Sequence, residues 1–386
     1  MEAAIASTGV QDSREAGHKL AAQIRGKLAK EPDAIVLFAA PTYDHLSLLQ
    51  SLRKAFASTI LVGASSAGEF TSDRMGEGLV SVLALQGEDI SFGLAVGRGM
   101  KQDAAAAARQ IAAQFKDAPD TSYPYRAALI MTDALAGHAE SFVDELTLAT
   151  GGQYAFFGGG AGDNAQFEKT VVFHGEEVLT DAAVALEILS QKPLGIGATH
   201  GWEPASEPLR VTEADGMSIV SLNGFPAVEA FHAYAERTGQ QLDRQTPIPF
   251  FLHNILGIDT GSGHRLRVPL AVGEDGSVSC ASEIPVGSIV QIMRSSNNSA
   301  IEAARRAADS ALVGLQENRP KAAIFFDCVA TRLRLGEQFA SEVDAIKDKL
   351  GSVELAGCNT HGQIVRAEGQ FQGFHNCTAV LCVFPE

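Results

Sequence analysis

Long apolar runs, an excess of basic residues and closely spaced cysteines are all missing from this 386-residue chain. No segment approaches the roughly 18 continuous apolar residues of a membrane-spanning helix. With 30 Lys and Arg against 46 Asp and Glu, the net charge is −16, which disfavours nucleic acids and anionic membranes as partners. The five cysteines are too few and too widely spaced for a disulfide framework or a cysteine metal site.

A secretory signal is not indicated either. The first residues, MEAAIASTGVQDSREAG, carry acidic side chains and lack the basic-then-apolar order of such a signal. We therefore expect a cytoplasmic protein with reduced thiols.

The common catalytic signatures are incomplete. The chain lacks the His-Glu-x-x-His pattern of zinc proteases and the Cys-x-x-Cys-His attachment site of c-type haem. GASSAGEF at 63–70 does not fit the Gly-x-Ser-x-Gly of a nucleophile elbow. Asp259-Thr260-Gly261 resembles half of an aspartic protease site, but no second copy supplies the other carboxylate. An enzyme is thus the least favoured class, and we expect no catalytic residues.

What the chain does contain is a unit that recurs three times. Each copy begins with an Ala-rich amphipathic helix, followed by a short apolar strand, a second helix, a second strand and a turn of small residues. The first helices are expected at 12–28, 102–115 and 298–315, and the strands that follow them at 34–40, 127–134 and 322–330. The second helices are expected at 45–56, 139–149 and 335–350.

The small-residue turns are the most similar part of the three units. They read GASSAGEF at 63–70, FGGGAGDN at 157–164 and GCNTHGQI at 357–364. The glycines of the second copy do not form a dinucleotide fingerprint, because Asp163 stands where the last glycine belongs and a strand-like stretch follows. Since the turn recurs, we interpret its glycines as serving backbone geometry rather than a phosphate.

A different stretch, at about 204–295, separates the second unit from the third. It combines a helix beginning at Pro226 with several strands bounded by turn signals. The whole chain therefore predicts a mixed α/β fold with largely antiparallel or mixed sheets.

Two histidines stand out because of their positions. His361 replaces the small residue found at the same turn position in the other two units, and His375 lies close to it in sequence. His138 begins a helix and is a third candidate for a site. For His200, beside the only Trp, we favour a structural hydrogen bond to loop backbone.

Several stretches together resemble the FIST family of bacterial ligand-sensing proteins, in the right order along most of the chain. They are VGASSAGEF (62–70), FGGGAGDNAQFEKTVVF (157–173), HGWEP (200–204), VTEADGMSIVSLNGFPAVEAF (211–231) and GFHNCTAVLCV (373–383). The resemblance implies a FIST N-type domain at 30–203, a FIST C-type domain at 204–386 and a helix within 1–29 packed on the first of them.

The resemblance also implies a function, that of a stand-alone sensor. It is closest to the nitric-oxide-sensing haem proteins of the family, which implies non-covalent haem b and signalling to a histidine kinase or a cyclic-di-GMP enzyme, with a homodimer allowed. For haem, we expect His361 as the iron ligand, with His375, Phe371 and Phe374 nearby and His138 in reserve.

The alternative is a haem-free sensor of a small metabolite such as an amino acid. The acidic and amide side chains at the turns, Glu69, Asp163 and Asn164, would then bind an ammonium group. Backbone N–H groups of the turns would bind the carboxylate.

Overall fold

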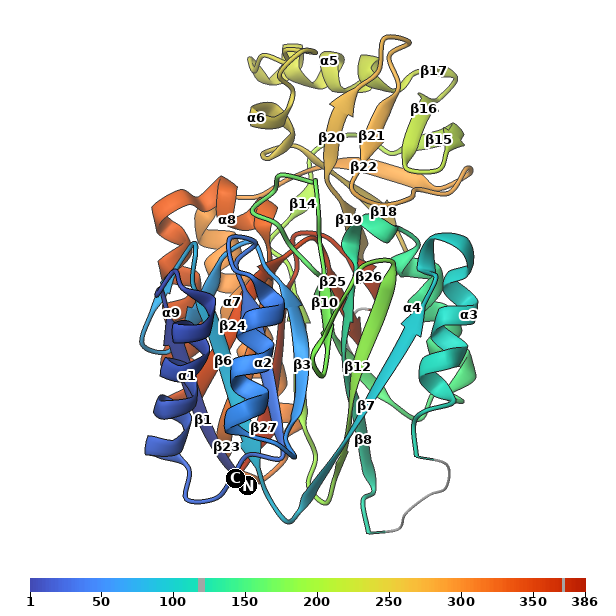
Figure 1. The fold of residues 1–386 in the computed structure, drawn as a ribbon. Helices are drawn as coiled ribbons and strands as arrows, with labels where there is room; N and C mark the ends of the chain where they lie inside the picture. Colours follow the sequence, from blue (N-terminus) through green and yellow to red (C-terminus); the bar gives the residue numbers. More distant parts are fainter. Residues whose placement is uncertain (117–121, 370–371) are drawn as a thin grey trace.

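The computed structural model describes residues 1–116, 122–369 and 372–386. It confirms a mixed α/β fold, built from three α/β units and an inserted domain that stands above them in Figure 1. No helix among these residues has both the length and the hydropathy needed to cross a membrane.

Each unit contributes four strands to its own sheet. In the first sheet these are β1 (Glu2–Thr8), β6 (Val80–Gln86), β2 (Ala34–Ala39) and β3 (Ile60–Ser65). In the second they are β7 (Ile90–Arg98), β12 (Ala182–Ser190), β8 (Tyr125–Thr132) and β9 (Ala155–Gly160). In the third they are β13 (Gly195–Thr199), β27 (Ala379–Pro385), β23 (Pro320–Cys328) and β24 (Glu354–Thr360).

The remaining strands are exchanged between units in a closed cycle. The first sheet is completed by β10 (Val172–His174) and β11 (Glu177–Leu179) of the second unit. The second sheet is completed by β25 (Gln363–Arg366) and β26 (Gly373–His375) of the third unit, and the third by β4 (Glu69–Thr71) and β5 (Met75–Gly76) of the first. The three units therefore form one body with pseudo-threefold connectivity.

Helices cover the outer face of each sheet, as Figure 1 shows. They are α1 (Ser13–Lys27) and α2 (His45–Ala55), α3 (Met100–Ala112) and α4 (Ala139–Ala149), and α7 (Asn297–Gly314), α8 (Val329–Leu335) and α9 (Phe339–Leu350). The prediction of a single helix at 335–350 is wrong at its start. Gly336, with φ +56°, ends α8, and a 3-10 turn (Gly336–Gln338) precedes α9. Residues 1–29 contain the strand β1 besides the expected helix.

The inner faces of the three sheets meet in one shared core. Phe38 of β2 packs edge-on against Phe326 of β23, with ring centroids 5.4 Å apart. Leu129 and Met131 of β8 belong to the same buried cluster. Because both faces of these strands are covered, their sequences are continuously apolar rather than alternating.

The recurring turns lie where the chain passes from one sheet to the next, and they hold one another. The N–H of Gly162 donates to the carbonyl of Ser65 at 2.8 Å, and that of Ala67 donates to Asn359 at 2.9 Å. The N–H of His361 donates to the carbonyl of Gly160 at 3.0 Å, which closes the ring.

The glycines of the strands before these turns allow close approach of backbone, as the sequence predicts. A Cβ added at Gly63, Gly158 or Gly357 would lie 1.8, 2.0 or 2.1 Å from a carbonyl oxygen of the neighbouring parallel strand. Gly158 also has φ +144°, a conformation that other residues rarely adopt.

Gly158→Ala is expected to lower the free energy of unfolding by roughly 2–3 kcal/mol, because the new methyl group would displace the backbone of Ile130. Urea denaturation measures the loss. Gly137→Ala is the control, since Gly137 has φ +74° but open space around its Cβ position, and should cost only about 1 kcal/mol. Equal losses in the two variants would contradict this account of Gly158.

The inserted domain has its own sheet and core. Its strands are β14 (Glu203–Pro204), β15 (Leu209–Asp215), β16 (Ser218–Leu222), β17 (Phe225–Pro226), β18 (Ile255–Asp259), β19 (His264–Arg267), β20 (Pro269–Val272), β21 (Val278–Cys280) and β22 (Ile289–Arg294). Helices α5 (Ala227–Thr238) and α6 (Ile248–Phe251) cover the sheet, with Phe231, Phe250 and Phe251 clustered beneath them.

Candidate functional site

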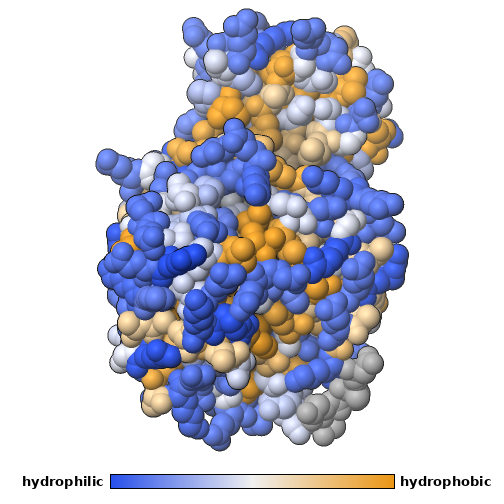
Figure 2. Space-filling view, in the orientation of Figure 1, coloured by the Kyte–Doolittle hydropathy of each residue, from blue (hydrophilic) through white to orange (hydrophobic). Residues whose placement is uncertain are grey.

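A cavity of about 360 Å³ lies between the inserted domain and the second and third units. From the units, the wall includes the segment from Ala134 to Glu140 before and at the start of α4, and Cys328 to Ala330 at the end of β23. From the inserted domain it includes Val268, Leu270 and the segment from Cys280 to Glu283. Figure 2 shows hydrophobic atoms reaching the surface where the two parts meet, within a mostly hydrophilic exterior.

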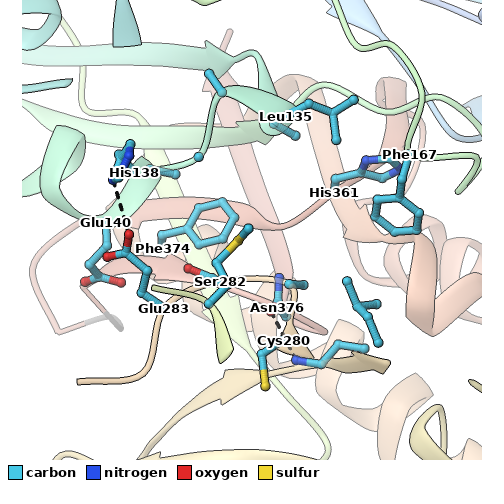
Figure 3. A pocket seen from close by; sticks show the side chains of 18 of the residues that line it. Leu135, His138, Glu140, Phe167, Cys280, Ser282, Glu283, His361, Phe374 and Asn376 are labelled. Atoms are coloured by element: carbon cyan, nitrogen blue, oxygen red, sulfur yellow. Dashed lines mark hydrogen bonds and ion pairs between the residues drawn. The ribbon is translucent and has the colours of Figure 1, made fainter. Parts of the chain in front are cut away.

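The walls of this cavity are mainly apolar, with polar side chains at a few places (Figure 3). Its larger apolar members are Leu135, Phe167, Met217, Val268, Leu270, Val329 and Phe374. Its volume and lining are those of small-molecule sites, in which a few polar groups orient a ligand held by apolar contact. Among the described lining residues there is no lysine or arginine.

Among the histidine and glutamate side chains that line the cavity, His361 is the most buried, with 5% of its side chain exposed. Its ring stacks on that of Phe167, with centroids 4.7 Å apart. Its Nε2 lies 3.4 Å from Oδ1 of Asp163, and neither ring nitrogen has a hydrogen-bond partner among the described residues. Burial lowers the pKa of His361 to about 4, against the opposing effect of Asp163, so the imidazole is neutral at pH 7.

The carboxylate of Asp163 organises the loop that carries Phe167. It accepts backbone N–H groups from Phe167 at 3.1 Å, Glu168 at 2.7 Å and Lys169 at 3.0 Å. Within this loop Asn164, Ala165 and Phe167 all have positive φ, between 56° and 60°. Left-handed non-glycine residues store strain and concentrate at ligand sites, which fits the position of the loop over His361.

A second histidine–carboxylate pair lies at another part of the wall. His138 precedes α4 with φ 57°, and its Nδ1 lies 3.2 Å from Oε1 of Glu283 in the inserted domain. Figure 3 shows this pair on the opposite side of the cavity from His361. Both side chains are nearly half exposed, so this pair lies near the mouth of the cavity.

Glu140 joins the inserted domain to the second unit behind the cavity wall. Its carboxylate accepts from Arg265 Nη1 at 2.5 Å and from Arg267 Nη2 at 2.9 Å. Arg267 is 1% exposed and also donates to the carbonyls of Glu283 and Phe374, at 3.0 and 3.1 Å. The two arginines and Glu140 thus hold strand β19 against α4 and β26.

The structure does not bring His375 and His361 to the same cavity. His375 lines a separate one, with His200, His264 and Arg265, and its Nε2 lies 3.0 Å from the carbonyl of Gln372. Burial lowers its pKa to about 3. Phe374 does line the cavity of His361, whereas Phe371 lies outside the described residues.

The turn residues expected to bind an ammonium group do not converge on a common space. Glu69 is fully buried and accepts from Ser66 Oγ at 2.6 Å and from the N–H of Leu79 at 2.9 Å. Burial raises the pKa of Glu69 to about 7. Asp163 is occupied by its own loop, and Asn164 is not part of the cavity wall.

His200 makes the structural hydrogen bonds expected of it. Its Nε2 lies 3.2 Å from the carbonyl of His264, and its Nδ1 accepts the N–H of Trp202 at 3.2 Å. Burial lowers its pKa to about 4.

Glu140, Arg267 and Cys328 were missed as parts of this site. Two arginines at alternate positions in the apolar segment HRLRVPLAV were the available signal, because a buried arginine requires a carboxylate partner. Nothing in the sequence identifies Glu140 as that partner. No group of His, Cys, Asp and Glu among the described residues is arranged to hold a metal ion.

Two comparisons of sequence identify relatives. Residues 33–224 match the FIST N domain and residues 230–366 match the FIST C domain, so their junction falls within the inserted domain, at β17 and the start of α5. An uncharacterized protein of Mycobacterium tuberculosis strain H37Rv is 24% identical over 233 residues, 56% of this chain and 57% of that protein. An uncharacterized protein of Mycobacterium bovis is 23% identical, over 56% of each chain. The matched part thus spans little more than half the length of these curated relatives.

Solved structures are similar only at a low level. A cyanuric acid hydrolase from A. caulinodans has a TM-score of 0.35 and 12% identity, covering 100% of this chain and 99% of its own. PurL of T. maritima complexed with FGAR has a TM-score of 0.23 and 12% identity, covering 99% of this chain and 72% of its own. Neither likeness supports a conclusion about function. The two domain matches, which together extend over most of the chain, show that the protein belongs to the FIST-domain family.

Proposed function

We propose that this FIST-domain protein is a sensor of a small, mainly apolar molecule that binds without haem in the cavity beside His361. The observation that carries the proposal is an apolar cavity of about 360 Å³ that contains a buried, neutral imidazole. Membership of the FIST family favours a role in signal transduction.

The chemistry of His361 specifies one feature of the ligand. Because the carboxylate of Asp163 can only accept hydrogen bonds, we place the proton of the neutral ring on Nε2, which lies 3.4 Å from Asp163 Oδ1. Nδ1 is then an acceptor, and it has no protein donor among the described residues. A ligand with an O–H or N–H group at one end of an apolar body would satisfy it. A free ammonium group, as in an amino acid, would find the carboxylates of Glu69 and Asp163 already hydrogen-bonded. The buried Asn164 Oδ1 has no partner among the described residues, but Asn164 does not line the cavity.

The same cavity offers a route from binding to signal. Its wall belongs partly to the inserted domain and partly to the units below, so a bound ligand would contact both. A ligand that binds more tightly to one arrangement of these parts shifts the population toward it. As the family resemblance implies, we propose that a histidine kinase or a cyclic-di-GMP enzyme detects the change.

A matched pair of probes tests the ligand chemistry. We expect 2-naphthol to bind about tenfold more tightly than 2-methoxynaphthalene, because only the former donates a hydrogen bond to His361. Titration calorimetry measures the ratio. His361→Leu should reduce the preference to near unity while retaining apolar binding, and an unchanged preference would overturn the role of His361.

The position of the site needs its own control. Ala281→Phe places a ring inside the cavity and should abolish binding of both probes. Ala271→Phe, on the exposed part of β20, should leave binding unchanged. If Ala281→Phe folds and still binds 2-naphthol, the ligand site lies elsewhere.

Haem b is the second candidate. It is favoured by the same Nδ1 of His361, which has no hydrogen-bond partner among the described residues. The residues fit an iron ligand: His361 would hold the iron through Nδ1, and Asp163 would orient the ring through Nε2. Bound haem would supply an iron able to bind nitric oxide. The apolar lining would exclude water from the bound group, and no described lining residue is a lysine or arginine that could pair with its carboxylates.

Absorption spectroscopy separates the two candidates. If haem is the cofactor, reconstituted protein should show a Soret band that moves on addition of nitric oxide. His361→Ala should then lose haem affinity at least tenfold, while His375→Ala, in the other cavity, should retain it. Reconstitution without a specific Soret band would exclude haem and leave the 2-naphthol test unaffected.

A further inference from the structure

Two cysteines from distant parts of the chain lie in one buried cluster, and one of them, Cys328, lines the cavity. Cys328 is the last residue of β23, and Cys377 lies in the turn that leads into β27. These antiparallel strands pair Phe326 with Val380, and two further residues along the same register place Cys328 beside Thr378, next to Cys377. Cys377 is therefore the sequence neighbour of the residue that lies opposite Cys328.

The two thiols also share one buried cluster, together with Trp202 and Met293. Each thiol shifts the pKa of the other, as expected of side chains that lie close together. Both are free thiols, 3% and 5% exposed. Cys328 is also one of the residues that line the cavity.

The surroundings of the two thiols shift their pKa values in opposite directions. Interaction with the Cys377 side chain is the main factor that lowers the pKa of Cys328 below its usual value. The same interaction, together with burial, raises the pKa of Cys377 well above it. Because the thiolate is the nucleophile, the sulfur of Cys328 reacts first with an oxidant. The thiol of Cys377 can then attack the oxidised sulfur of Cys328.

We propose that Cys328 and Cys377 form a redox site that a hydroperoxide entering the cavity converts to an intramolecular disulfide. The Cys328 thiolate attacks the O–O bond, giving a sulfenic acid at Cys328 and releasing an alcohol, or water if the oxidant is hydrogen peroxide. The Cys377 thiol then attacks this sulfur, forming the S–S bond and releasing water. In total, two thiols and one hydroperoxide give one disulfide, one alcohol and one water.

The disulfide would act on the cavity wall directly. Cys328 is followed by Val329 and Ala330, which line the cavity at the start of α8. A covalent bond from Cys328 to the turn before β27 would restrain this part of the wall within the third unit. This inference does not depend on which ligand the cavity binds.

Thiol mapping by mass spectrometry tests the proposal. After exposure to a small excess of hydrogen peroxide, the full-length protein should lose two of its five free thiols and yield a Cys328–Cys377 cross-linked peptide. Dithiothreitol should restore both thiols. Absence of that peptide under conditions that oxidise the protein would overturn the proposal.

Single variants establish the order of events. Cys377→Ser should stop at a sulfenic acid on Cys328, trapped by dimedone, and Cys328→Ser should show at least a tenfold slower loss of the Cys377 thiol. Cys280→Ser is the matched control, because Cys280 lines the same cavity but burial raises its pKa to about 12, and it should still form the cross-link at the wild-type rate. Dimedone labelling of Cys280 in preference to Cys328 would contradict the assignment.

Discussion

Replacing Glu140 with alanine is expected to lower the free energy of unfolding by about 3–5 kcal/mol, because it leaves a buried guanidinium without its counter-ion. Arg267 is 1% exposed, and its other hydrogen bonds go to backbone carbonyls, which cannot neutralise its charge. Arg265 loses the same partner. Urea denaturation followed by circular dichroism measures the effect.

A control for this substitution lies on the same helix. Glu145 pairs with Arg109 on the surface of α4, and Glu145→Ala should cost less than about 1 kcal/mol, as exposed ion pairs do. If Glu140→Ala and Glu145→Ala were equally stable, the ion cluster would not hold the inserted domain. Glu140→Gln, which keeps one acceptor, should fall between them.

Acid is expected to destabilise the fold between pH 6.5 and pH 4, because three buried histidines must remain neutral. Burial lowers the pKa values of His200 and His361 to about 4 and that of His375 to about 3, from an ordinary 6.5. In this window the unfolded chain binds protons that the folded chain does not, so stability is present above pH 6.5 and lost as the pH falls. Each group contributes roughly 3 kcal/mol by pH 4, and together they rival the total stability of an ordinary domain.

Buried carboxyl groups oppose this trend. Glu69, with a pKa raised to about 7, adds stability as the pH falls through 7, and that gain is complete below its unfolded value of 4.5. Burial also raises the pKa of Glu342 and Asp327. The two sets of groups titrate over much the same pH range, so the loss caused by the histidines is assigned by individual histidine variants rather than by the net change.

Urea midpoints measured at several pH values between 7 and 4 test this balance. His375→Gln removes one buried titrating group and should make the decline measurably shallower, whereas His18→Gln on the exposed face of α1 should leave it unchanged. If His375→Gln does not alter the fall of the urea midpoint with pH, protonation of His375 does not lower the stability of the fold.

Much of the fold could be predicted because its signals are local. The helix at 139–149 has the predicted bounds, and the strand at 34–40 ends within one residue of its prediction. The error at 335–350 also has a local cause, since an isolated glycine inside a helical pattern does not reveal whether it interrupts the helix.

The site was less accessible to prediction. His361 stands out because the other two turns have a small residue at its position, and it does line the cavity. His375 was grouped with it on sequence proximity, yet the backbone between them turns through the β25–β26 hairpin and places His375 in another cavity. The partners Asp163 and Glu283 lie far away in sequence from His361 and His138, which no local pattern reports.

The three helix–strand units, their short apolar strands and the glycine turns follow from the sequence, because periodicity and backbone sterics act over a few residues. Only the tertiary structure decided the exchange of hairpins between sheets, the cavity under the inserted domain and the shared cluster of Cys328 and Cys377. These features depend on contacts between residues tens to hundreds of positions apart, whose pairing is fixed by the packing of whole units rather than by any nearby residue.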